Sequence, residues 1–240
     1  MAKKNVLVII PARGGSKRVP HKNIKLFCGR PLISLAIDQA LKLSFVDRII
    51  VDTDSSAIAA LAKKYGAEVP FLRPARLAQD SSRVIDSILH LLSRLQKEEN
   101  YSPSYVLLLQ ATSPLRELKD ITKCWQFMKS SQATTVVTVC ATRPKPKDLV
   151  WVKDVSTAMP ANLSVGPEKA ALHGYNGFVY IIETKALLSE KKIITKKTET
   201  VVCPEWRSVD IDVPEEWALA EILFKNQAKL IERMQAVAKK

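Results

Sequence analysis

The sequence has few glycines and aromatic residues, and it lacks long apolar runs. Its 240 residues include 7 glycines and 13 prolines, which excludes collagen-like and low-complexity chains. The longest apolar stretches fall short of the roughly 18 residues that span a membrane, and Val6–Ile10 is too short for the core of a signal peptide. Four cysteines share no C-x-x-C spacing, so we expect reduced thiols in a cytoplasmic protein: Cys28, Cys124, Cys140 and Cys203.

Acidic residues are also in short supply. Lysine and arginine number 37 against 24 acids, which gives a formal net charge of +13. Such a surface could attract nucleic acid or anionic lipid, or part of it could line a pocket for a polyanionic small molecule. Residues 1–37 hold eight basic residues and no acid, whereas we expect the lysines within Lys185–Lys197 and at the C-terminus to be solvated surface charge.

Short β-branched runs alternate with helical periodicity through the first 140 residues. This alternation predicts an α/β fold with a mostly parallel sheet flanked by helices, and a ligand site at the carboxyl ends of the strands. Strands are expected at 5–10, 48–53, 105–109 and 134–140, and helices at 31–41, 55–65, 84–95 and 119–129. Further regular structure is expected at 178–182 and 208–211, followed by one helix from Glu215 to about Ala238.

The alternation stops at residues 141–173, which carry four prolines and no clear helical period. We interpret this stretch as an insertion, a lid or an oligomerisation arm. The length and pattern predict a single domain over residues 1–240 with this inserted segment.

A loop rich in glycine and basic residues follows the first strand, Pro11 to Lys17. Gly14 and Gly15 allow a close backbone approach with N–H groups turned to a ligand, and Arg13 and Lys17 suit phosphate oxygens. The loop is neither a P-loop nor a G-x-G-x-x-G fingerprint. A phosphate cradle and a purely structural turn both remain open.

Two aspartates, Asp210 and Asp212, are spaced so that a strand would project both from one face. Two carboxylates together suit Mg²⁺ held jointly with substrate phosphates, and the alternative is a solvated pair that caps the next helix. Asp52 and Asp54 form a rival pair, although the position of Asp54 before a helix favours a capping role.

The end of the third strand carries a polar cluster, Gln110 to Arg116, which is either part of a binding site or a capped turn. The three histidines have no metal-ligand spacing, and G-x-S-x-G is absent.

Together these motifs resemble those of the acylneuraminate cytidylyltransferases, the CMP-sialic acid synthetases. The resemblance rests on five segments in order: VIIPARGGSKRVPHKN at 8–23, Asp52-Thr-Asp54, RPARLAQD at 73–80, LLLQATSPLR at 107–116, and Asn176-Gly with SVDID at 208–212. It implies a nucleotidyltransferase-type, Rossmann-like α/β fold with a small extension that mediates homodimerisation. It also implies a reaction that joins CTP to a nine-carbon 2-keto sugar acid with Mg²⁺, giving a CMP-sugar and pyrophosphate.

The resemblance assigns a role to each matching residue. Arg13, Ser16 and Lys17 would surround the CTP phosphates, and Gly14 and Gly15 would shape that loop. Catalysis would rest on Lys17, Arg13 and Asp212. The remaining expected roles are cytidine contacts for Asn23 and Arg73, Mg²⁺ ligation for Asp210 and Asp212, and acceptor contacts for Gln110 and Asn176.

The acceptor pocket departs from the family pattern. Members that activate sialic acid carry an arginine shortly before the Asn-Gly turn, whereas this chain offers Lys169 or His173 there. Val84 replaces a small hydroxylated residue. The acceptor is therefore expected among the nonulosonic acids, with legionaminic and pseudaminic acid as candidates beside N-acetylneuraminate.

Two other functions are less consistent with the sequence. A 3-deoxy-manno-octulosonate cytidylyltransferase would carry an acidic Q-G-D-E-P-type motif where this chain has Gln110-Ala-Thr-Ser-Pro114. A basic nucleic-acid-binding module would interleave exposed aromatic and basic residues, and aromatics make up only 6%. We therefore expect neither a nucleic acid nor a membrane as a partner.

Overall fold

The computed structural model describes residues 5–141, 150–154, 157–160 and 173–238. Much of the predicted extension at 141–173, including Lys169, lies outside these ranges. Among the described residues, no helix combines the length and apolar character that a membrane crossing requires. All four cysteines lie in the described ranges, and each is a free thiol as expected.

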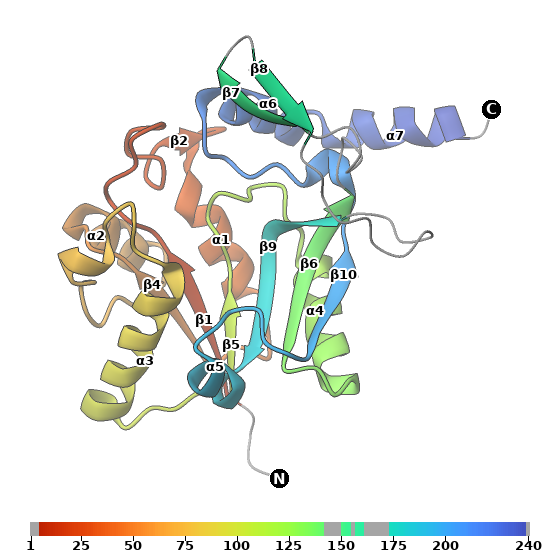
Figure 1. The fold of residues 1–240 in the computed structure, drawn as a ribbon. Helices are drawn as coiled ribbons and strands as arrows, with labels where there is room; N and C mark the ends of the chain where they lie inside the picture. Colours follow the sequence, from red (N-terminus) through yellow and green to blue (C-terminus); the bar gives the residue numbers. More distant parts are fainter. Residues whose placement is uncertain (1–4, 142–149, 155–156, 161–172, 239–240) are drawn as a thin grey trace.

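Strands and helices alternate along the chain (Figure 1). The strands are β1 (Val6–Pro11), β2 (Leu26–Phe27), β3 (Arg30–Pro31), β4 (Arg48–Asp52), β5 (Tyr105–Leu108), β6 (Thr135–Ala141), β7 (Val150–Asp154), β8 (Thr157–Pro160), β9 (His173–Glu183) and β10 (Thr198–Val202). The helices are α1 (Leu32–Leu41), α2 (Ser56–Lys64), α3 (Val84–Glu99), α4 (Leu118–Ser130), α5 (Thr184–Glu190), α6 (Pro214–Lys225) and α7 (Gln227–Ala238), with 3₁₀ turns η1 (Ala75–Leu77) and η3 (Glu205–Arg207).

The described residues form a six-stranded sheet in the order β10-β6-β9-β5-β1-β4. Neighbouring pairs β1–β4, β1–β5 and β6–β10 are parallel, and β9 runs antiparallel to β5 and β6. The predicted mostly parallel α/β sheet is therefore confirmed. β7 and β8 pair with each other in a separate antiparallel hairpin.

Both faces of the sheet are covered by helices. On β1, Val6, Val8 and Ile10 pack in one cluster with residues of α1, α2 and α4. The alternate residues Leu7 and Ile9 pack in a second cluster with residues of α3 and α5. This burial on both sides explains why the strand reads as a continuous apolar run.

A third, smaller cluster packs α6 against the N-terminal part of the chain. Phe27 contacts Trp217 edge-on, with ring centroids 5.6 Å apart, and Ile211 is buried in the same cluster. The cluster therefore fixes the position of the chain just before α6.

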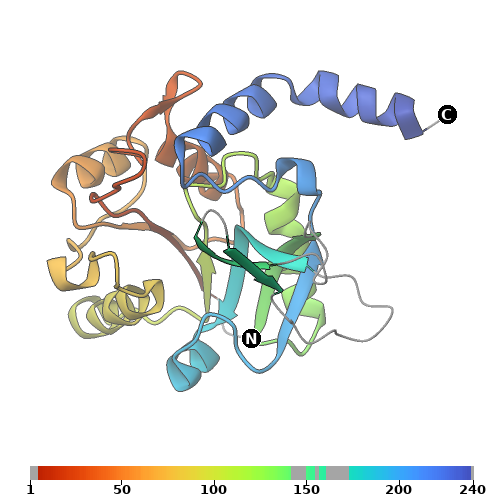
Figure 2. The same cartoon turned by 45° about the horizontal axis from the view of Figure 1, so that its top comes forward.

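Two predictions near the C-terminus are wrong. Residues 208–211 are not a regular element, and the strand of this region is β10, whose β-branched residues pair with β6. The expected single C-terminal helix is two helices, because Asn226 donates from its side chain to the Ile222 carbonyl, 2.8 Å away, and ends α6. Helix α7 then extends away from the sheet and buries no side chain (Figures 1 and 2).

Of the two residues that could cap the helix after β4, Asp54 and Ser55, the structure uses Ser55, so the expected capping role of Asp54 is wrong. The N-cap of α2 is Ser55, whose hydroxyl accepts from the Ile58 N–H at 3.4 Å. The Asp54 carboxylate accepts instead from the Gly14 N–H at 2.8 Å. Gly66 follows the C-cap residue Tyr65 with φ +91°, the left-handed conformation that glycine commonly adopts after a helix.

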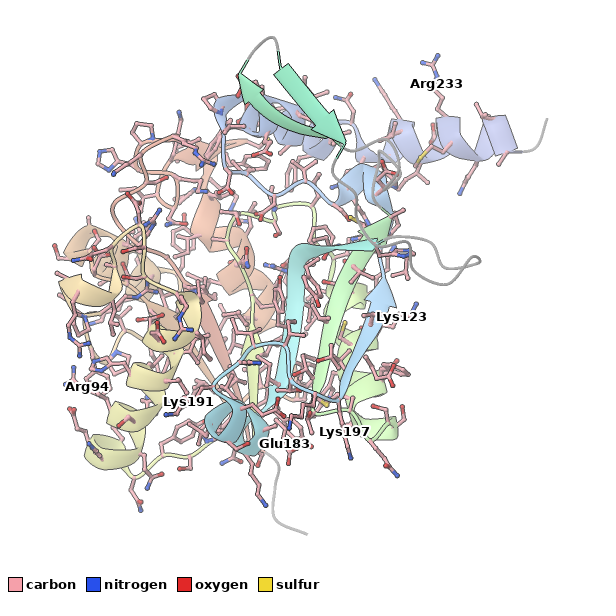
Figure 3. All side chains as sticks on the ribbon, in the orientation of Figure 1. Arg94, Lys123, Glu183, Lys191, Lys197 and Arg233 are labelled. Carbon is pink, nitrogen blue, oxygen red and sulfur yellow. The ribbon has the colours of Figure 1, made fainter. Side chains whose placement is uncertain are left out.

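The basic surface residues are spread over the molecule. Arg94, Lys123, Lys191, Lys197 and Arg233 lie at separate points around its margin (Figure 3). These labelled residues therefore do not form one continuous basic face.

A buried ion pair fixes η3 to the start of α4. The Arg207 guanidinium lies 2.5 and 2.6 Å from the two carboxylate oxygens of Asp120, and the side chains are 3% and 6% exposed. Asp120 also accepts from the Glu117 N–H at 2.8 Å. The pair thus anchors the segment that leads to Asp210.

Replacing Arg207 by alanine should destabilise the protein by about 3–5 kcal/mol, because it leaves a buried carboxylate without its cation. Chemical denaturation measures this change. Lys119→Ala, which removes an ion pair with Glu117 whose lysine is 75% exposed, is the control and should cost less than about 1 kcal/mol. Equal effects of the two variants would contradict the assignment of Arg207 as an anchor.

Candidate functional site

A cavity of about 630 Å³ opens at the carboxyl ends of β1 and β5. Parallel strands end at this edge, so the segments that follow them converge there. The lining residues are Pro11, Arg13, Ser16, Lys17, Arg18, Lys22, Asn23, Arg73, Asp80, Val84, Gln110, Ala111, Thr112, Asp210 and Asp212. Eight of the eleven residues predicted for a site are among these; Gly14, Gly15 and Asn176 are not.

The basic loop after β1 supplies one wall of this cavity. The Asn23 side chain, 7% exposed, donates to the Arg13 carbonyl at 3.0 Å and so fixes the loop backbone. The Gly14 N–H donates to Asp54 and is not turned to the cavity. The expectation that this N–H faces a ligand is therefore wrong. A Cβ at Gly14 would lie 3.1 Å from the Ser55 Cβ, so packing against the start of α2 accounts for this glycine.

Arg13 and Lys17 share one carboxylate. Asp80 places one oxygen 2.8 Å from the Arg13 guanidinium and the other 2.6 Å from the Lys17 ammonium. The Lys17 side chain is otherwise 82% exposed. The hydrogen bond from Lys17, and after it that from Arg13, holds the pKa of Asp80 below its usual range, so Asp80 is ionised at neutral pH.

Arg73 reaches the cavity from the chain after β4 and is paired with Asp52. Their closest N–O distance is 2.7 Å, and both side chains are almost fully buried. Arg73 also donates to the Asp52 carbonyl at 2.8 Å. Because Asp52 is bound to Arg73 and Asp54 to Gly14, the rival aspartate pair is used within the protein.

Asp210 and Asp212 form a second wall of the cavity, in an irregular segment on either side of the buried Ile211. The Ile211 N–H donates to the Thr112 carbonyl at 2.9 Å, which ties this segment to the chain after β5. The two carboxylates therefore reach the same cavity although the segment is not a strand.

The two carboxylates differ in their surroundings. Asp212 is 61% exposed and accepts from Lys22 at 2.8 Å. Burial raises the pKa of Asp210 despite the opposing hydrogen bond from Thr112, and its Oδ1 is buried with no hydrogen-bond partner. An unsatisfied buried carboxylate oxygen is costly unless a cation or donor reaches it.

Gln110 and Asp210 meet at Gly177. A Cβ on Gly177 would lie 3.1 Å from the Ser113 Oγ, 3.2 Å from the Gln110 Oε1 and 3.4 Å from the Asp210 Oδ2. The Ser113 hydroxyl is buried and, like the Asp210 Oδ1, has no hydrogen-bond partner. The absence of a side chain at 177 thus lets three oxygen-bearing side chains converge.

Neighbouring side chains hold this corner in place. Arg116 is fully buried and donates to the carbonyls of Gln110 and Phe178, each at 2.9 Å. Burial lowers the pKa of Arg116 to about 10. Asn176 is 3% exposed, donates to Ser208 at 3.0 Å and accepts from the Phe178 N–H at 3.2 Å, so its side chain supports the turn.

The two aspartates fit a hard cation whose remaining ligands are waters or substrate phosphate oxygens. Among the described residues, no group of three or more His, Cys, Asp or Glu side chains could hold a metal. Two carboxylates with one orphaned oxygen are instead suited to Mg²⁺, which is usually bound by one or two carboxylates together with waters and phosphate oxygens.

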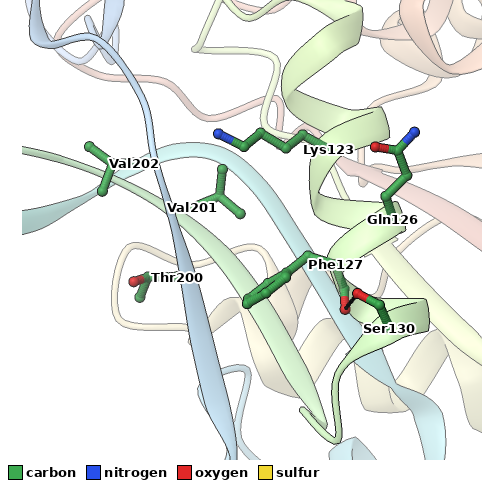
Figure 4. A pocket seen from close by; sticks show the side chains of 7 residues that line it. All are labelled: Lys123, Gln126, Phe127, Ser130, Thr200, Val201 and Val202. Carbon is green, nitrogen blue, oxygen red and sulfur yellow. Dashed lines mark hydrogen bonds between the residues drawn. The ribbon is translucent and has the colours of Figure 1, made fainter.

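A second hollow, of about 440 Å³, lies between α4 and β10 and is drawn in Figure 4. Lys123 is the one charged residue of its lining, which otherwise consists of neutral side chains such as Phe127 and Val202. This hollow lacks the paired carboxylates and clustered cations of the first cavity. The first cavity is therefore the candidate active site.

Four polar lining residues were not predicted as site residues: Arg18, Lys22, Asp80 and Thr112. Lys22 lies within the N-terminal motif at 8–23, and its spacing from Arg13 and Lys17 could have identified it as a further basic residue of the site. Asp80 ends the motif at 73–80, but its pairing with two cations depends on the tertiary fold.

Comparisons with known proteins agree on one family. A family described as "Cytidylyltransferase" matches residues 7–234. The CMP-N,N'-diacetyllegionaminic acid synthase of Legionella pneumophila is 36% identical, over 94% of this chain and 99% of that protein. The pseudaminic acid cytidylyltransferase of Campylobacter jejuni serotype O:2 is 32% identical, over 91% and 96%.

A solved structure shares the fold. CMP:2-keto-3-deoxy-manno-octonic acid synthetase in complex with CTP superposes with a TM-score of 0.68 at 17% identity, covering 93% of this chain and 99% of that one. At this identity the likeness establishes the fold alone.

Gly177→Ala should cost more stability than Gly29→Ala. Both glycines have positive φ, +75° and +86°, so both substitutions introduce similar backbone strain, but a Cβ at Gly29 meets nothing within 4 Å. We expect the extra contacts at 177 to add about 1 kcal/mol or more. Denaturant unfolding measures both, and equal losses would contradict the crowding of Gln110, Ser113 and Asp210 around Gly177.

Proposed function

The chain belongs to the cytidylyltransferase family and is a nucleotidyltransferase, and from this premise we propose that it joins CTP to a nonulosonic acid, a nine-carbon 2-keto sugar acid. The products are the CMP-sugar and pyrophosphate. The observation that carries the proposal is the cavity in which a cluster of cations faces two aspartates, one with an orphaned oxygen.

The basic wall is proposed to bind the triphosphate. Arg13, Lys17 and Lys22 supply charge-assisted donors, and Ser16 adds a hydroxyl. Asn23 fixes the loop that carries Arg13. With their phosphate partners in place, Arg13 and Lys17 would neutralise the leaving pyrophosphate. Arg73, held by Asp52, is proposed to contact the cytidine.

The carboxylate wall is proposed to hold Mg²⁺ through Asp210 and Asp212. When bound, the ion would supply positive charge that offsets the negative charge of the phosphates during transfer. Lys22 already contacts Asp212 and so links the metal side of the cavity to the phosphate side. The Oδ1 of Asp210 is buried without a hydrogen-bond partner, and it is the oxygen that we propose as a ligand of the ion.

The acceptor is proposed to lie beside Gln110 and the turn at Gly177. Its anomeric oxygen attacks the α-phosphorus and forms the new P–O bond while the bond to pyrophosphate breaks in line, and the hydroxyl proton passes to water. Positioning and charge neutralisation then supply most of the catalysis, because the residues need only hold the reactants in line. Val84, at the start of α3, lines the same cavity and limits its polarity on that side.

The choice of a nonulosonic acid follows from the relatives, whose names specify legionaminic and pseudaminic acids. The homodimer implied by the family resemblance and the cytoplasmic location inferred from the cysteines stay predictions. So does the role of residues 141–173 as a dimerisation extension.

We expect the purified protein to release pyrophosphate from CTP and Mg²⁺ only when a nonulosonic acid is added. The acceptor panel should include legionaminic, pseudaminic and N-acetylneuraminic acids and 3-deoxy-manno-octulosonate. Mass spectrometry of the CMP-sugar identifies the acceptor. Activity confined to 3-deoxy-manno-octulosonate, or none with any acceptor, would overturn the proposed substrate class.

Asp210→Asn should lower turnover by about 100-fold or more, because it removes charge that stabilises the transition state. It should leave the melting temperature unchanged or higher, since the cost of burying the Asp210 charge outweighs its hydrogen bond from Thr112 and its Oδ1 has no partner. Steady-state kinetics against Mg²⁺ and thermal unfolding measure the two effects. Glu215→Gln, an exposed acid on α6, is the control, and near wild-type turnover in Asp210→Asn would remove this residue from the metal site.

A further inference from the structure

Asp80 occupies the position between Arg13 and Lys17 that the proposed function assigns to phosphate. Its two oxygens each bind one cation, at 2.8 and 2.6 Å. A phosphoryl group that bridged the same two side chains would present two oxygens in the same way. The carboxylate and the phosphate therefore compete for one pair of cations.

The backbone and the side chains of this region are held by different partners. Asn23 and Asp54 fix the backbone of the basic loop through the Arg13 carbonyl and the Gly14 N–H. The outer ends of Arg13 and Lys17 are held by Asp80, which comes from a different segment. Exchange of the anion thus needs no rearrangement of the loop backbone.

The segment that carries Asp80 has hydrogen bonds of its own. Ser82 donates from its hydroxyl to the Arg76 carbonyl at 3.0 Å and from its N–H to the Gln79 carbonyl at 3.1 Å. These bonds shape the turn at residues 76–82 without using Arg13 or Lys17.

The exposure of the cluster makes the carboxylate easy to displace. The side chains of Arg13, Lys17 and Asp80 are 38%, 82% and 49% exposed, and ion pairs at such positions are weak. Pyrophosphate and triphosphate carry several negative charges against the single charge of Asp80, so they win the competition when present. After transfer, Asp80 can take back the cations as pyrophosphate departs.

We propose that Asp80 is a built-in counter-anion that competes with the triphosphate of CTP and with product pyrophosphate for Arg13 and Lys17. This inference rests on the proposed function, because it takes these two residues as the phosphate site. Asp80 keeps the cations oriented in the free enzyme and weakens the binding of both polyphosphates. It is a positioning residue for the reaction, not a catalytic one.

Isothermal titration of the full chain with pyrophosphate and with CTP, each with Mg²⁺, tests the proposal. Asp80→Asn keeps the size of the side chain and removes its charge, so both dissociation constants should fall by about three- to tenfold, the scale of losing two exposed ion pairs. Asp86→Asn is the matched control, because Asp86 pairs with Arg83 close by in the sequence but does not line the cavity. Its dissociation constants should equal those of the wild type.

Lys17→Ala separates this inference from the proposed function. It should weaken pyrophosphate binding, and in the Lys17→Ala background the effect of Asp80→Asn should shrink because one of the two shared cations is gone. If Lys17→Ala weakens binding but Asp80→Asn leaves it unchanged or weaker, the counter-anion role is wrong and the phosphate site stands. If Lys17→Ala has no effect, both are overturned.

Kinetics give a readout that a structural role would not produce. Asp80→Asn should lower the KM for CTP and the inhibition constant of pyrophosphate together, without raising kcat. A raised KM for CTP in this variant would contradict the proposal.

Discussion

Burying a carboxylate without a compensating partner costs free energy, and the site depends on one such group, Asp210. Its Oδ1 is buried and unpartnered, and burial raises its pKa. Lys22, a cation that lines the same cavity, binds Asp212 and the Ile211 carbonyl instead. The free protein thus retains a carboxylate that a bound metal ion would satisfy. The basic side chains of the loop after β1 line the same cavity, and an anionic ligand bound there would bring the metal ion with it.

Two buried ion pairs keep this arrangement in place. Arg73 bound to Asp52 fixes the chain after β4, and Arg207 bound to Asp120 fixes the chain after β10. Breaking either pair would leave a buried charge, so each acts as a strong local constraint. Between them the parallel strands end at one edge, and the packing of Ile211 under α6 sets where Asp210 and Asp212 emerge.

Much of the fold could be predicted from the sequence because strands buried on both faces read as continuous apolar runs. β1, β4, β5 and β6 were found in this way. β10 is not evident from the sequence, because only Val201 of its five residues is buried and this edge strand has no continuous apolar run. The break at Asn226 was missed because it depends on a side-chain hydrogen bond to the Ile222 carbonyl, which the helical period conceals.

Local motifs likewise located the site residues but not their partners. The sequence pointed to Arg13, Lys17, Asp210 and Asp212, and the structure brings them to one cavity. Their pairings join residues 63 to 190 positions apart, such as Lys17 with Asp80 and Lys22 with Asp212, and no local pattern encodes these distances.

The central claim is that this cavity holds CTP and a divalent cation at Asp210 and Asp212. A crystal structure with CTP and Mn²⁺, which has an anomalous signal, tests it most directly. The account predicts one anomalous peak at about 2.1 Å from carboxylate oxygens of both aspartates, with the triphosphate between it and Lys17. A metal or nucleotide bound elsewhere, such as in the hollow between α4 and β10, would contradict it.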